Sequence, residues 1–166
     1  HRAAFYSRRA EARLALSGIL GIADEPRGGP IPPRIVREDV VEGYPTEHVF
    51  FFSAPDIVVT GVMIHPRAAG SASGTTLVLF DRGTNAIPAQ RDLLEGLLGE
   101  GQRLFVFDPR GMGAVETRPV NGRGGQDAFG TEYKLGCDAL MLGISTLGLR
   151  VFDVLRGLDY LKGRTD

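Results

Sequence analysis

The stretch TTLVLFDRGTNAIPAQRDLLEGLLGEGQRLFVFD, residues 75–108, decides the fold. Residues 75–81 and 103–108 are short apolar runs, which is the pattern of strands that are covered on both faces. Residues 87–101, between them, predict a helix, because four leucines fall on one of its sides (Leu93, Leu94, Leu97 and Leu98). A strand, a helix and a second strand in this order predict a parallel pair of strands joined by a right-handed crossover.

The residues before this unit predict a hairpin and an N-terminal helix. Residues 48–53 (HVFFFS) and 56–66 (DIVVTGVMIHP) are rich in β-branched and aromatic residues around a Pro-containing turn, which predicts an antiparallel hairpin. Residues 3–20 are rich in the helix formers Ala, Leu and Arg, whereas Pro and Gly make the next segment a linker. We therefore divide the chain into a helix with its linker, residues 1–33, and an α/β domain, residues 34–166.

The residues after this unit predict a loop and a helix. Residues 109–130 form a long loop rich in Gly and polar residues, and loops of this length are often functional. Residues 132–162 predict one continuous helix, because apolar residues recur at three- and four-residue spacing. The predicted fold class is therefore α/β: an N-terminal helix and an antiparallel hairpin lead into a parallel sheet flanked by helices.

The segment GISTLG, residues 143–148, is one residue away from G-x-S-x-G, the nucleophile elbow of serine hydrolases. An elbow needs a strand that runs into the first glycine, and small residues around the serine. No strand is predicted before Gly143, and Leu147 occupies a position that must be small. We therefore interpret Ser145 as a residue of the helix and not as a nucleophile.

A second motif, DPRGMGAVE at residues 108–116, has two glycines with the spacing that begins a dinucleotide-binding motif. Glu116 stands where the third glycine should be, and its carboxylate would repel a phosphate. A nucleotide-binding domain remains an alternative, which predicts a thermal shift with NAD or ATP. The prediction that we prefer includes no cofactor.

The composition argues against several other classes of function. The chain has 19 basic and 20 acidic residues, so its net charge of −1 suggests neither a nucleic acid nor an anionic membrane as a partner. Cys137 is the single cysteine, which excludes an internal disulfide and a cysteine-based zinc site. His48 and His65 are interpreted as surface or satisfied side chains, and no cluster of ligands suggests a metal.

The order of motifs resembles the first half of an α/β-hydrolase, especially the acetyl-xylan-esterase-like and prolyl-oligopeptidase-like branch. In that branch a strand that ends in D-x-R-G-x-G precedes a long loop, as Asp108, Arg110, Gly111 and Gly113 do here. A helix with the rhythm R-x-x-D-x-x-R-x-x-D-Y-L follows, matched by Arg150, Asp153, Arg156, Asp159, Tyr160 and Leu161. The resemblance covers about residues 45–166, and it departs at FDRGT, where many relatives have His-Gly or His-Gly-Gly.

The resemblance implies roles for five residues. In such enzymes a serine attacks an ester carbonyl, and backbone N–H groups of an oxyanion hole stabilise the intermediate. By this correspondence Arg82, Gly83 and Thr84 line the oxyanion hole, with a backbone N–H of Gly83 or a neighbour pointing at the mouth of the sheet. Asp108 and Arg110 brace the loops at the strand ends.

The resemblance also implies that the catalytic serine, acid and histidine lie beyond residue 166, so no catalytic residue is expected within residues 1–166. One apolar strand would lie at an open edge, which predicts that the natural protein continues into a strand that carries the nucleophile. We expect the N-terminal part of a serine carboxylic-ester hydrolase, with acetylated carbohydrate as a candidate substrate. Its expected partners are a small-molecule or carbohydrate ester and the remainder of its own chain. The rival hypothesis is a non-catalytic hydrolase-fold binding module. A secreted or periplasmic location is compatible with the resemblance.

Overall fold

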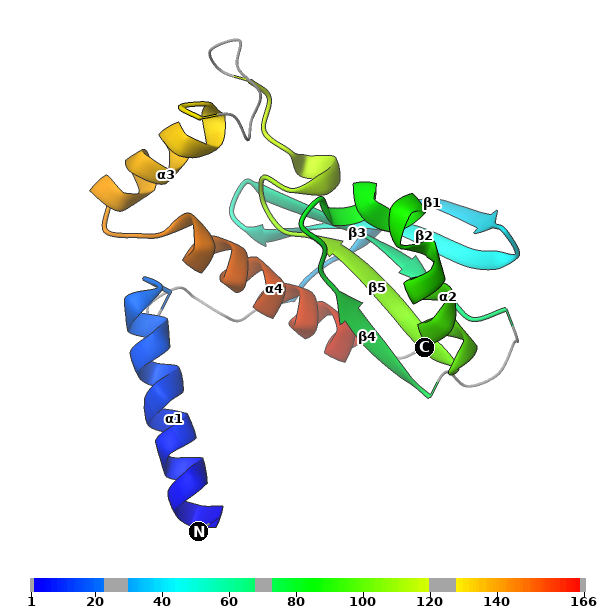
Figure 1. The fold of residues 1–166 in the computed structure, drawn as a ribbon, viewed down its shortest axis with the longest axis horizontal. Helices are drawn as coiled ribbons and strands as arrows, with labels where there is room; N and C mark the ends of the chain where they lie inside the picture. Colours follow the sequence, from blue (N-terminus) through cyan, green and yellow to red (C-terminus); the bar gives the residue numbers. More distant parts are fainter. Residues whose placement is uncertain (1, 23–29, 68–72, 120–127, 165–166) are drawn as a thin grey trace. The chain divides into compact units, whose positions relative to one another are not determined.

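The computed structural model describes residues 2–22, 30–67, 73–119 and 128–164 (Figure 1). The chain divides into two compact units, and each is described by itself. The helical unit comprises His1–Gly28 and Arg118–Phe152, and the sheet unit comprises Gly29–Thr117 and Asp153–Asp166.

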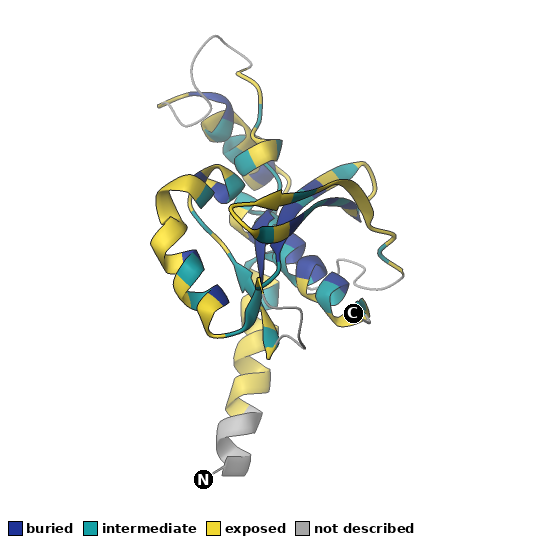
Figure 2. Cartoon of the chain, turned by 90° about the vertical axis from the view of Figure 1, so that its right-hand side faces the viewer, coloured by how far each residue is buried: buried dark blue, intermediate teal, exposed yellow. Residues whose placement is uncertain are grey.

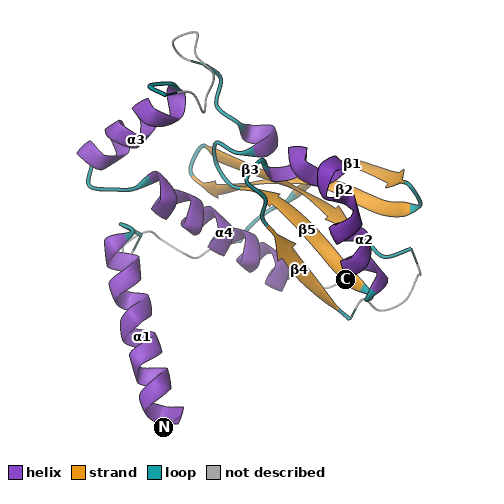
Figure 3. Cartoon of the chain, viewed as in Figure 1, coloured by secondary structure: helices purple, strands orange, loops and turns teal. Residues whose placement is uncertain are grey.

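The sheet unit contains a five-stranded sheet in the order β1-β2-β3-β5-β4 (Figure 3). The strands are β1 (Arg34–Val41), β2 (Tyr44–Ala54), β3 (Ile57–Ile64), β4 (Gly74–Val78) and β5 (Gln102–Asp108). β4 and β5 pair in parallel, so the predicted parallel pair of strands is confirmed. The pairs β1–β2, β2–β3 and β3–β5 are antiparallel, so the sheet is mixed.

Strand β1 was not predicted, because its sequence RIVREDVV shows no alternation of apolar and polar residues. Every residue of β1 except Asp39 is exposed. Of the two outer strands of the sheet, β1 carries charged side chains and an irregularity between Ile35 and Arg37. Charges and bulges protect an edge strand against pairing with other chains, and they also remove the apolar pattern that would have revealed the strand.

Helices cover both faces of the sheet. On one face, Leu94 and Leu98 of α2 (Arg91–Gly99) join a buried cluster with Val62, Ile64, Leu104 and Val106 of β3 and β5. On the other face, Tyr160 of α4 (Thr146–Gly163) belongs to a cluster of seven buried residues that includes Phe51, Phe105 and Phe107. Figure 2 shows buried residues on the sheet and on the helix that packs against it. The mixed α/β architecture with flanking helices is confirmed.

The predicted helix 87–101 is shorter in the structure. Its first residues belong to a 3-10 helix, η1 (Gly83–Gln90), and the α-helix begins at Arg91. Leu94 and Leu98, four residues apart, face the sheet, whereas Leu93 is exposed. Two adjacent leucines lie about 100° apart on a helix, so a short helix on one face of a sheet does not bury both members of each pair.

The helical unit contains α1 (Arg2–Ile19), which confirms the N-terminal helix, and α3 (Thr131–Met141). The predicted continuous helix 132–162 was wrong, because residues 142–145 separate α3 from α4. Gly143 has a positive φ of 75°, a conformation that ends a helix and favours glycine. In the described part of the chain no single helix is long and apolar enough to cross a membrane. The bent pair of α3 and α4 has the required length and composition only when the two helices are taken as one segment.

Candidate functional site

The carboxyl ends of β4 and β5 lie at the same edge of the sheet, because the two strands are parallel. Open α/β sheets bind ligands outside this edge. Asp108, the last residue of β5, and Asp153, on α4, are both buried with no exposed surface. These two carboxylates organise the loops that leave the edge.

Asp108 accepts four hydrogen bonds from three segments of the chain. Its Oδ1 accepts the backbone N–H of Thr84 at 2.6 Å, and its Oδ2 accepts the Thr84 hydroxyl at 2.6 Å. Oδ2 also accepts the backbone N–H of Ala114 at 3.0 Å and the hydroxyl of Thr60 at 3.2 Å. The carboxylate therefore joins the loop after β4, the loop after β5 and strand β3.

Two glycines surround this carboxylate. Gly83 and Gly113 have positive φ values of 54° and 57°, and a Cβ on either residue would overlap Oδ1 of Asp108. The positive φ disfavours any L side chain, and the close approach excludes one on steric grounds. This packing explains why glycine follows Arg82 and why the D-x-R-G-x-G pattern ends in glycine.

Arg110 pairs with Asp153. Its Nε donates to Oδ2 and its Nη2 donates to Oδ1, both at 2.7 Å, and its backbone N–H donates to Oδ2 at 2.9 Å. The Ser53 hydroxyl donates to Oδ1 at 2.6 Å. A two-point arginine–carboxylate pair of this geometry is strong and directional. This pair was not predicted from the sequence, although each partner belongs to one of the two motifs that carry the resemblance.

The three residues assigned to the oxyanion hole donate their backbone N–H groups within the protein. The N–H of Arg82 donates to Oδ1 of Asp81 at 2.8 Å, and that of Gly83 donates to the carbonyl of Phe80 at 3.1 Å. The N–H of Thr84 donates to Asp108. The structure therefore aims the Gly83 N–H at the Phe80 carbonyl, and the oxyanion role of the three residues stays a prediction.

Ser145 lies immediately before α4, so its interpretation as a residue within a helix was wrong. Its Oγ accepts the backbone N–H of Gly148 at 2.9 Å, which is the geometry of an N-cap. No strand precedes it, since α3 ends at Met141. The elbow-like spacing of GISTLG is therefore explained by a helix start.

Replacing Ser145 by alanine should lower the free energy of unfolding by about 1 kcal/mol, because the cap would be lost. Ser145→Asp should retain most of the stability, since aspartate caps helices equally well and its charge suits a helix N-terminus. Urea denaturation of the three proteins measures the difference. Equal losses in both variants would contradict the capping role.

The two histidines differ in their surroundings. Nε2 of His65 lies 2.8 Å from Oε1 of Glu47, so His65 is a satisfied side chain as predicted. Arg164 donates to both oxygens of Glu47, at 2.7 and 3.1 Å. Nε2 of His48 lies 3.9 Å from Oδ2 of Asp39. Within the described ranges, no group of three or more His, Cys, Asp or Glu side chains could hold a metal ion.

Burial by itself raises the pKa of Glu47, but the hydrogen bonds and charges of Arg164 and His65 outweigh it and hold the pKa below its ordinary value of 4.5. A lowered pKa in the folded state means that Glu47 stabilises the fold above pH 4.5 and loses this contribution as the pH falls further. Glu47→Gln should therefore be less stable than the native protein at pH 6, with a difference that shrinks below pH 4.5. Denaturation at both pH values measures it; a difference that grows in acid would contradict the assignment.

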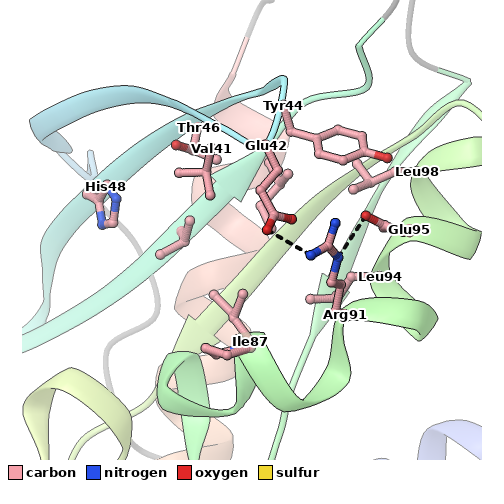
Figure 4. Close-up of a pocket in the computed structure, with 13 residues that line it drawn as sticks. Val41, Glu42, Tyr44, Thr46, His48, Ile87, Arg91, Leu94, Glu95 and Leu98 are labelled. Atoms are coloured by element: carbon pink, nitrogen blue, oxygen red, sulfur yellow. Dashed lines mark hydrogen bonds and ion pairs between the residues drawn. The ribbon is translucent and has the colours of Figure 1, made fainter.

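A pocket of about 350 Å³ opens between the β1–β2 hairpin and α2 (Figure 4). Its apolar wall comes from Val41, Val62, Ile64, Ile87, Pro88, Leu94 and Leu98. Arg91 joins Glu42 of the hairpin, at 2.8 Å, to Glu95 of α2, at 3.1 Å. A second pocket, of about 430 Å³, is lined by Thr84 and Ala114, and His48 lines both pockets. Apolar walls with a few polar groups are typical of small-molecule sites.

No family model matches the sequence, and no curated protein matches it. The fold is similar to the crystal structure of a "putative acetyl xylan esterase" from Bacteroides fragilis NCTC 9343, with a TM-score of 0.73 and 18% sequence identity. The match covers 96% of this chain and 44% of that one, so the chain spans less than half of the esterase's length. At this identity the likeness concerns the fold: the chain has an α/β fold similar to part of that protein.

Proposed function

We propose that this chain is the N-terminal part of a serine carboxylic-ester hydrolase that acts on a small-molecule or carbohydrate ester. The observation that carries the proposal is the edge of the sheet, where Asp108 and the Arg110–Asp153 pair fix the two loops in a fold similar to a putative acetyl xylan esterase. The nucleophile, the acid and the histidine lie beyond residue 166 in this proposal.

In such an enzyme the serine attacks the ester carbonyl, the histidine accepts its proton, and the acid orients the histidine. The contribution of this chain is a backbone donor from residues 82–84 to the oxyanion. To act as this donor, an N–H group of residues 82–84 must release its internal acceptor and bind the substrate oxygen, or donate to both oxygens at once. The Gly83 bond to Phe80, at 3.1 Å, is the longest of the three and therefore the cheapest to exchange.

A fluorophosphonate probe, which reacts with activated serines, tests the proposal on the intact gene product. We expect one labelled serine, located by peptide mapping after residue 166, and equal labelling of the Ser145→Ala variant. Residues 1–166 alone should hydrolyse p-nitrophenyl acetate no faster than their own Ser145→Ala variant. A label on Ser145, or turnover by the fragment that Ser145→Ala abolishes, would contradict both the proposal and the capping role.

A well-folded gene product that takes no label would favour the non-catalytic binding module. The apolar pocket between the β1–β2 hairpin and α2 supports this alternative, because it offers a small-molecule site away from the carboxyl ends of β4 and β5. The nucleotide-binding alternative has less support. Gly83 and Gly113 enclose the carboxylate of Asp108, and a phosphate approaching these glycines would meet that negative charge.

A further inference from the structure

We propose that Asp108 is a positioning residue for the predicted oxyanion loop and that it acts through Thr84, an inference that rests on the proposed function. The backbone N–H and the hydroxyl of Thr84 both donate to this carboxylate, one to each oxygen and both at 2.6 Å. Two bonds to two atoms fix the direction of the Thr84 backbone as well as its distance. The Gly83–Thr84 peptide is thereby held in one orientation. This peptide lies within residues 82–84, whose backbone N–H groups are the candidate donors.

The carboxylate can serve as a reference point because it is itself immobilised. Asp108 has no exposed surface, and Oδ2 also accepts bonds from Ala114, on the other loop, and from Thr60, on β3. All four donors are uncharged, so direction and packing hold the group, and the α-hydrogen faces of Gly83 and Gly113 close around it. The loops after β4 and β5 are therefore coupled through a single side chain.

This role differs from that of the Arg110–Asp153 pair, which ties the loop after β5 to α4. Oxyanion donors act only when they are placed within a few tenths of an ångström, and small displacements cost large factors in rate. Releasing Thr84 should therefore reduce kcat, whereas a variant that weakens the sheet elsewhere should reduce stability alone.

The experiment compares three variants of the intact gene product. Thr84→Val removes the hydroxyl bond to Oδ2 and keeps the side-chain shape, and Thr84→Ser keeps the hydroxyl. Thr76→Val is the matched control. The Thr76 hydroxyl donates to Gln102 Oε1 at 3.2 Å within the β4–β5 pair, away from the carboxyl ends of the two strands. We expect Thr84→Val to lower kcat per labelled active site by about tenfold or more, with KM little changed. Thr84→Ser should restore most of the rate, and Thr76→Val should keep it.

Hydrogen exchange of the peptide that covers residues 80–86 provides a readout that does not depend on catalysis. Exchange should be faster in Thr84→Val than in Thr76→Val, and Asp108→Asn, if it folds, should show the same increase. Equal exchange in the two valine variants, or equal kcat, would overturn the positioning role. Failure of the native protein to take the fluorophosphonate label would overturn the proposed function and the catalytic part of this inference, while the exchange data would still decide whether Asp108 fixes the loop.

Discussion

Replacing Gly83 or Gly113 by alanine should lower the free energy of unfolding by about 3–5 kcal/mol. At positive φ an L side chain costs about 1–2 kcal/mol. In addition, the new Cβ would overlap Oδ1 of Asp108, so the buried carboxylate must move and lose hydrogen bonds, each worth about 1–3 kcal/mol when a buried partner is left unsatisfied. Urea denaturation of each variant measures the loss.

Gly96, in the middle of α2, is the matched control. No atom lies within 4 Å of the position that its Cβ would take. Because alanine favours a helix over glycine by up to about 1 kcal/mol, Gly96→Ala should be neutral or stabilising. Gly83→Ala and Gly113→Ala should therefore destabilise the protein, whereas Gly96→Ala should not. Similar effects at Gly83 and Gly96 would show that Asp108 does not occupy the space described here.

The sequence predicted the elements whose signals are local. β4, α2 and β5 follow one another between residues 74 and 108, and each has an apolar pattern of its own. β1 was not predicted, because an exposed edge strand has no such pattern. The break at residues 142–145 was missed for a different reason, because the apolar spacing continues across it. Its only signals are Gly143, which ends α3, and Ser145, which caps α4.

The candidate site was harder to predict, because its contacts join residues that are distant in the sequence. Asp108 and Arg110 were assigned to bracing through a resemblance, and the partners that they bind could not be deduced from spacing. Thr84 lies 24 residues from Asp108, and Asp153 lies 43 residues from Arg110. Strand order brings these pairs together, and the order of the strands was not predicted from the sequence.

The second large effect should come from Arg110. Arg110→Met should lower the free energy of unfolding by about 3–5 kcal/mol, because it leaves the fully buried carboxylate of Asp153 without its cation. The double variant Arg110→Met/Asp153→Leu should be more stable than Arg110→Met alone, since a buried ion pair can be replaced by apolar side chains at little cost. A double-mutant cycle measured by urea denaturation gives the coupling between the two sites.

The pair formed by Arg91 and Glu42 is the control for this cycle, because it has a similar distance of 2.8 Å but both side chains are about half exposed. Arg91→Met should leave the free energy of unfolding almost unchanged, since water and salt screen an exposed pair. Burial, and not the presence of an ion pair, therefore decides which arginine the fold requires. If the single and double variants at residues 110 and 153 were equally unstable, the loss would come from packing, and the charge of Asp153 would not organise the loop after β5.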